Sequence, residues 1–144
     1  MAQPIPTPTR WSAPYWQAAR EGRLMIQGCK SCNRLIMYPK PFCPTCLGDD
    51  LDWRPSEGAG EVYTVTVQRA GAPSGFEDQV PYVLAVVKLD EGVQLMTRLV
   101  GDDAESANCG DRVTVDFQPA PGADVVLPVF RLAKQDSGPQ GGKP

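Results

Sequence analysis

Two Cys-x-x-Cys pairs, separated by the ten residues 33–42, constrain this chain more than any other feature of its sequence. Each pair can present two sulfurs from one tight turn, and two such turns facing each other form the tetrahedral S4 cage of structural zinc. Asn33, directly after the first pair, tolerates the left-handed conformation needed where the chain curls back. The spacing predicts a zinc ribbon in which residues 34–42 form a β-hairpin. The predicted ligands are Cys29, Cys32, Cys43 and Cys46.

Other uses of four cysteines remain open at this stage. Two disulfides are possible, although this spacing in a cytosolic protein more often indicates a metal site. A redox pair needs only one Cys-x-x-Cys, and iron in a rubredoxin-like centre would use the same four sulfurs. We favour zinc because nothing else in the chain indicates electron transfer.

The complete absence of histidine from the 144 residues excludes several functions. Neither a Ser-His-Asp triad nor a Cys-His couple can form, and zinc with histidine ligands is excluded too. The fifth cysteine, Cys109, lies in an acidic segment where carboxylates oppose thiolate formation, so we expect it to be neither ligand nor nucleophile. We therefore predict no catalytic residues in this chain.

The charge and the hydropathy pattern limit the possible partners. The formal net charge is −3, which disfavours nucleic acid as a partner through bulk electrostatics. No signal-like segment opens the chain and no apolar run approaches the roughly 18 residues of a membrane helix, so we expect a cytoplasmic protein. Basic residues do gather in and before the predicted ribbon, namely Arg20, Arg23, Lys30, Arg34 and Lys40.

The N-terminal third is expected to hold a helix and then the ribbon. Alternating prolines make the first ten residues an arm, and Ser12 is placed to cap a helix over 13–21 that Gly22 ends. The helix is too short to be stable alone, so Tyr15 and Trp16 must bury against this chain or against another one. The predicted divisions are an arm and helix over 1–22, a zinc ribbon over 23–54, a barrel over 55–133 and a disordered tail over 134–144.

The rest of the chain reads as five short strands. They are expected near residues 62–67, 83–89, 93–100, 111–117 and 129–132, and Tyr63, Val65 and Val67 are expected to share one face. Asp90-Glu91-Gly92 indicates a tight hairpin, and long connections follow the first and fourth strands. This arrangement favours a five-stranded OB-fold barrel over a sandwich, so the overall prediction is a mainly β protein.

A series of short motifs, in a fixed order along the chain, indicates a known protein family. It runs through Tyr15-Trp16, Gly22-Arg23-Leu24, both cysteine pairs, Tyr38-Pro39-x-Pro41, Trp53, Gly58-x-Gly60-x-Val62-x-Thr64, Pro81-Tyr82 and Gly110-Asp111-x-Val113. The series resembles the zinc-ribbon OB-fold proteins, a domain of unknown function, that accompany thiolases and other acyl-CoA enzymes. The resemblance covers about Trp11 to Leu132.

The resemblance implies a non-catalytic accessory subunit of an acyl-CoA thiolase-type complex in the metabolism of lipids, steroids or aromatic acids. The partner would supply the catalytic residues, and this chain would support assembly or activity with a structural zinc. Two alternatives stay open: an accessory subunit of an acyl-CoA hydratase or aldolase, and a single-stranded nucleic-acid binder. Whether Arg69 or Phe76 in the first long loop touches CoA is left open.

Overall fold

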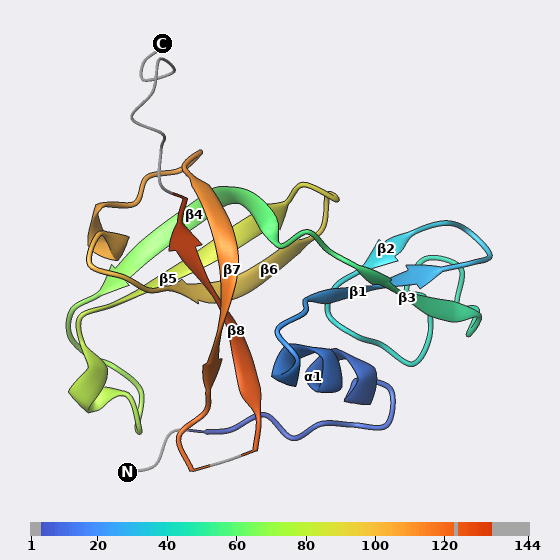
Figure 1. The fold of residues 1–144 in the computed structure, drawn as a ribbon, viewed down its shortest axis with the longest axis horizontal. Helices are drawn as coiled ribbons and strands as arrows, with labels where there is room; N and C mark the ends of the chain where they lie inside the picture. The colour runs from blue at the N-terminus through green and yellow to red at the C-terminus, as the bar shows by residue number, and fades with distance from the viewer. Residues whose placement is uncertain (1–3, 123, 134–144) are drawn as a thin grey trace.

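The computed structural model describes residues 4–122 and 124–133, which form one helix, a small three-stranded sheet and a closed barrel (Figure 1). The tail expected over 134–144 and the first three residues of the arm lie outside the described residues. In the part of the chain that is described, no helix has the length and apolar character needed to cross a membrane.

The single α-helix, α1 (Ala13–Arg20), packs between the small sheet and the barrel. Tyr15 is buried in the main core, so this aromatic side chain packs within its own chain. Gly22, at φ +78°, ends the helix as predicted. The capping prediction was wrong in one respect: Ser12 occupies the N-cap, but its hydroxyl accepts the N–H of Thr9 (2.8 Å) and makes no side-chain bond to the helix.

The small sheet has the order β2-β1-β3, with both pairings antiparallel. Its strands are β1 (Met25–Cys29), β2 (Leu35–Ile36) and β3 (Leu51–Pro55). The expected hairpin within residues 34–42 is not formed. Only Leu35–Ile36 is a strand, and it pairs with β1 across the first cysteine turn. The prolines at 39 and 41 explain this difference, because proline cannot donate to a ladder.

The barrel closes in the order β4-β5-β6-β8-β7, with β7 returning to β4. Its strands are β4 (Ala59–Gln68), β5 (Tyr82–Leu89), β6 (Gln94–Leu99), β7 (Arg112–Pro119) and β8 (Val126–Leu132). Two 3-10 turns, η1 (Glu77–Gln79) and η2 (Ala104–Ser106), lie in connections. Strands β6 and β8 run parallel and pair at Leu99 and Phe130, where the Val100 N–H also donates to the Phe130 carbonyl at 2.9 Å. Five strands closed in this way form the predicted OB-fold.

Alternate side chains along the strands point inward and form the core of the barrel. Leu95, Thr97 and Leu99 of β6 are buried, and Phe130 of β8 is fully buried. The prediction for Tyr63 was wrong, because a β-bulge between Val62 and Thr64 shifts the register of β4. Val62 is consequently buried while Tyr63 is 60% exposed.

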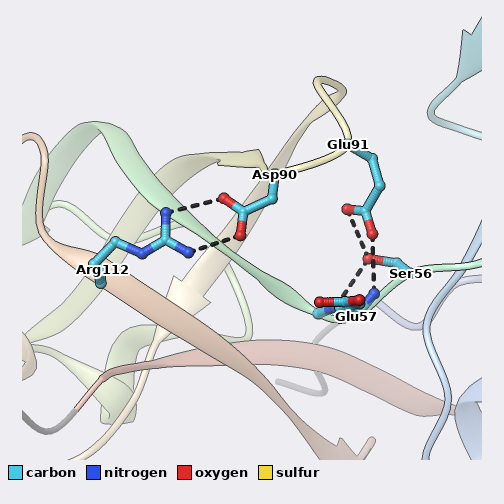
Figure 2. A network of polar contacts seen from close by, with 6 residues as sticks. Ser56, Glu57, Asp90, Glu91 and Arg112 are labelled. Atoms are coloured by element: carbon cyan, nitrogen blue, oxygen red, sulfur yellow. Dashed lines mark hydrogen bonds and ion pairs between the residues drawn. The ribbon is translucent and has the colours of Figure 1, made fainter.

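A polar network joins the ribbon-to-barrel linker to the β5–β6 hairpin (Figure 2). The Glu91 carboxylate accepts the Ser56 hydroxyl at 3.1 Å and the Glu57 N–H at 3.0 Å. Beside it, Arg112 of β7 donates two hydrogen bonds to Asp90 at 2.9 and 2.8 Å. These contacts hold the start of β4 against the neighbouring strands that it must pair with.

Candidate functional site

The two cysteine turns have the same backbone geometry. Asn33 donates its N–H to the Cys29 carbonyl (2.8 Å), and Leu47 does the same to Cys43 (2.9 Å). Both donors have φ of 62°. The left-handed conformation predicted for Asn33 is therefore present, and it has an equivalent at Leu47 that the sequence did not indicate because leucine disfavours it.

These turns bring the four predicted ligands together. All four sulfurs lie within 4.8 Å of one another, with Cys29–Cys46 and Cys32–Cys43 each separated by 3.6 Å. A tetrahedral site with Zn–S bonds of about 2.3 Å has sulfur–sulfur edges of about 3.8 Å. The cluster consequently fits zinc, and the four cysteines are held for metal rather than joined in disulfides. Zinc here is structural, because a closed S4 set leaves no ligand position for a substrate.

Burial differs within each pair. Cys29 and Cys43 are fully buried, whereas Cys32 and Cys46 are exposed. Backbone N–H groups, first that of Cys46 and then that of Thr45, lower the pKa of the Cys43 thiol. These N–H groups favour the thiolate form of Cys43, which is the form that binds a metal ion. Cys29 and Cys43 thus pack in a small apolar cluster with Ile36, while Cys32 and Cys46 lie at the surface.

Gln27 is a positioning residue that sequence reasoning missed. It is 4% exposed, and its side-chain amide accepts the Lys40 N–H (2.7 Å) and donates to the Lys40 carbonyl (2.9 Å). This pair of bonds fixes the irregular segment 37–42, which follows β2 and has no strand of its own. A polar residue at the end of the apolar run Leu24-Met25-Ile26 was the available signal.

Cys109 and the residues singled out in the first long loop are not part of the cluster. Cys109 is exposed in the β6–β7 connection. In the first long loop, Arg69 pairs with Glu105 at 3.1 Å, and the Phe76 ring lies 5.9 Å from that of Tyr82. Of the basic group, Arg20 pairs with Asp124 at 2.7 Å.

A hollow of about 440 Å³ lies where the N-terminal segment, the ribbon and the barrel meet. The side chains of Trp11, Tyr15 and Tyr38 line it together with Met96 and Leu127 of the barrel. The Met96 N–H donates to the Tyr38 hydroxyl at 2.6 Å, so ribbon and barrel are hydrogen-bonded at this point. This arrangement depends on segments far apart in the sequence, and no local pattern predicted it.

Two family models match the chain. Residues 16–52 match "ChsH2, rubredoxin-like zinc ribbon domain", and residues 53–118 match "ChsH2, C-terminal OB-fold domain". Together these matches include the cysteine cluster and most of the barrel.

Curated relatives include proteins of two descriptions. The chain is 38% identical over 131 residues to a "Probable enoyl-CoA hydratase alpha subunit" of Thermomonospora curvata, a match covering 91% of this chain and 40% of that longer protein. It is also 37% identical over 100 residues to a "DUF35 domain-containing scaffold protein" of Pyrococcus furiosus, covering 69% of this chain and 72% of the relative.

Solved structures are similar as well. A chain of the "Ltp2-ChsH2(DUF35) aldolase" matches with a TM-score of 0.77 and 38% identity, over 89% of this chain and 98% of that one. A DUF35 protein of unknown function from Sulfolobus solfataricus shares the fold at 11% identity, with a TM-score of 0.59 over 88% of this chain and 87% of its own.

Proposed function

This chain belongs to the ChsH2-type DUF35 family of zinc-ribbon OB-fold proteins, and from that membership we propose that it is a non-catalytic accessory subunit of an acyl-CoA enzyme complex. The observation that carries this proposal is the match to the DUF35 chain of an aldolase, which spans 98% of that chain. The catalytic partner supplies the reacting groups, and this chain supports its assembly or its activity.

The names of the same relatives indicate which classes of enzyme the catalytic partner could belong to. Their names support an acyl-CoA hydratase or an aldolase. A thiolase-type partner, implied by the family resemblance, is the third member of the proposed set. The chain spans 40% of the hydratase subunit that it resembles. A hydratase partner is therefore a proposal for this chain and not a property carried over from that longer protein.

We also propose that Cys29, Cys32, Cys43 and Cys46 bind one zinc ion per chain. The distances between their sulfurs and the closed form of the cluster support this assignment. When bound, zinc would cross-link the two cysteine turns and would not act as a Lewis acid on a substrate. Thiols kept for a metal are typical of a reducing compartment, which supports the cytoplasm as the place of action.

The chemistry of the chain is consistent with an accessory role. Thiolysis, condensation and hydration of acyl-CoA substrates need a nucleophile or a base of suitable pKa. The sequence has no histidine, and its fifth cysteine is an exposed loop residue outside the cluster. We infer that a partner brings the reacting groups.

Purification of the tagged chain from its source cell, with mass-spectrometric identification of what co-purifies, tests this proposal. We expect a stoichiometric acyl-CoA hydratase, aldolase or thiolase subunit. The lone chain should show no turnover with acyl-CoA substrates, and the partner should be less active or less stable without it. Turnover by the lone chain, or a partner that is fully active and stable alone, would overturn the proposal.

A further inference from the structure

A second hollow lies on the outer face of β5, β6 and β8, beneath the long loop that joins β4 to β5. It measures about 370 Å³ and is lined mainly by Phe76, Tyr82, Leu84, Met96, Leu127 and Pro128. In OB-folds this face and this loop commonly carry the ligand. Strands β6 and β8, which border the hollow, pair at a single position, and the Thr97 hydroxyl donates to the Pro128 carbonyl at 3.1 Å between them.

Met96 lies at the centre of this surface. It is 61% exposed, and it lines both this hollow and the one beside Tyr38, as Leu127 and Pro128 also do. The two hollows therefore form one apolar surface, which we call the β6–β8 groove. Methionine and aromatic side chains are enriched at protein interfaces, and continuous apolar surface of this kind marks interaction sites.

Arg98 is the one charged side chain in the lining of the second hollow. Its Nη1 donates to Gln79 Oε1 at 2.6 Å, and its guanidinium carbon lies 5.2 Å from the centre of the Tyr82 ring. Its Nε is buried without a hydrogen-bond partner. Within residues 4–122 and 124–133, no carboxylate lies at ion-pair distance from Arg98; the ion pairs there involve other arginines.

Partial burial of this cation has a cost that an anion would offset. Desolvation lowers the pKa of Arg98, although the group stays protonated at neutral pH. Arginine is enriched in interface cores because its planar donors pair with carboxylates while its stem packs on apolar neighbours. The groove thus combines apolar area with one unpaired positive charge.

We propose that the β6–β8 groove is the docking site for an apolar segment of the catalytic subunit that brings one carboxylate to Arg98. This inference rests on the proposed accessory function. A nucleic acid fits less well, because a single cation lines the hollow and the exposed acidic residues Glu77 and Asp78 lie in the loop above it. An apolar protein segment that carries a single carboxylate satisfies both the shape and the charge.

Matched variants of the full chain test this proposal against the catalytic subunit identified by co-purification. Met96→Asp places a charge in the groove, while Tyr63→Asp places one at an equally exposed apolar residue on β4. We expect Met96→Asp to raise the dissociation constant about 100-fold and Tyr63→Asp to change it less than about threefold. Arg98→Met keeps the apolar volume and removes the charge; it should weaken binding at least about 30-fold and reduce its salt dependence.

Photocrosslinking gives a second measurement that does not depend on affinity. Benzoyl-phenylalanine in place of Met96 should crosslink to the catalytic subunit, and the same residue in place of Tyr63 should not. Unchanged zinc content and melting temperature of each variant will show that the fold is intact.

Several results would overturn the inference. Equal binding by Met96→Asp and Tyr63→Asp, or crosslinking from position 63 alone, would place the interface elsewhere while leaving the accessory function standing. Loss of oligothymidylate binding in Met96→Asp would assign the groove to nucleic acid, and loss of self-association in sedimentation would assign it to a second copy. If no catalytic subunit binds the wild-type chain, the proposed function fails together with this inference.

Discussion

Gly60 lies where β4 pairs with two strands at once, opposite Leu89 of β5 and Val113 of β7. A Cβ at this position would lie 2.4 Å from the Lys88 carbonyl oxygen and 2.9 Å from the Leu89 Cα. Both are backbone atoms of a paired strand, so they cannot move without disturbing the barrel. This contact gives a physical reason for the Gly-x-Gly spacing noted in the sequence.

The first prediction is that Gly60→Ala destabilises the protein by about 1–3 kcal/mol, the usual cost of overpacking. Gly48→Ala is the control, because Gly48 has no positive φ and its nearest contact would be 3.4 Å away. Urea unfolding will measure both variants. Equal midpoints for the two would contradict the close approach of β4 to β5.

The second prediction concerns the metal. Zinc binding by small finger peptides provides about 10–16 kcal/mol, and the three-stranded sheet offers little apolar core of its own. Cys43→Ser should therefore lose the zinc and unfold the ribbon, while Cys109→Ser should keep one zinc per chain. Elemental analysis of purified protein will decide between zinc and iron as well. Full zinc content in Cys43→Ser would contradict the ligand assignment.

Both cysteine turns need a residue with a left-handed backbone, and the two residues at that position differ in how well they tolerate it. Asn33 accepts φ of 62° with little strain, but Leu47 has the same φ and a side chain that is 76% exposed. A non-glycine residue in this region costs about 1–2 kcal/mol. The exposed side chain offers little packing energy to offset that cost.

The third prediction follows: Leu47→Gly should stabilise the ribbon by about 1 kcal/mol and raise its apparent zinc affinity. Asn33→Gly is the matched control in the other turn and should change stability little. Thermal unfolding and competition with a chelator will measure both effects. A less stable Leu47→Gly protein would show that contacts of the leucine side chain stabilise the turn by more than the backbone strain costs.

The β5–β6 hairpin provides a pH-dependent element. The hydrogen bonds from Arg112 lower the pKa of Asp90 below its usual value. Because the folded-state pKa is lowered, the stabilisation is present above the unfolded pKa of about 3.9 and is lost as pH falls through the folded value.

The fourth prediction is therefore that carbon NMR titration will find the Asp90 pKa below about 3.9, and that Arg112→Met will raise it. The pKa of Asp116, which Arg131 and the Phe117 N–H lower, should not respond to that substitution. An Asp90 pKa that is the same in both proteins would mean that the ion pair does not form in solution.

At the scale of the whole molecule, ribbon and barrel share one hydrophobic core, in which Ile26 of β1 packs with residues of the barrel strands. The linker network holds one side, and the bond from the Met96 N–H to the Tyr38 hydroxyl holds the other. Helix α1 fills the space between them, with Tyr15 in the shared core. The groove proposed for the partner therefore depends on both units being correctly placed.

The fifth prediction tests this coupling. Tyr38→Phe removes one hydrogen bond worth about 1 kcal/mol, so the Met96 amide should exchange with solvent about five- to tenfold faster. Tyr63→Phe makes the same chemical change on β4 and should leave that amide unaffected. Hydrogen exchange followed by NMR provides the measurement, and unchanged Met96 exchange in Tyr38→Phe would mean that the Tyr38 hydroxyl does not protect this amide in solution.

The sequence alone determined the features that depend on local spacing. Two Cys-x-x-Cys pairs predicted the metal cluster, β-branched alternation predicted the barrel strands, and Asp90-Glu91-Gly92 predicted the hairpin. Each of these features arises from residues within a few positions of one another, so the chemistry can be read directly from their order. The family resemblance added the accessory role, which no single residue in the chain indicates.

Tertiary structure decided what depends on distant segments meeting. The bulge that turns Tyr63 outward, the Gln27 bonds that replace a hairpin and the groove around Met96 each require partners from elsewhere in the chain. Arg98 shows the reason most clearly. Its charge is visible in the sequence, but whether this half-buried cation has an anion beside it is determined only by how β5, β6 and the long loop pack together.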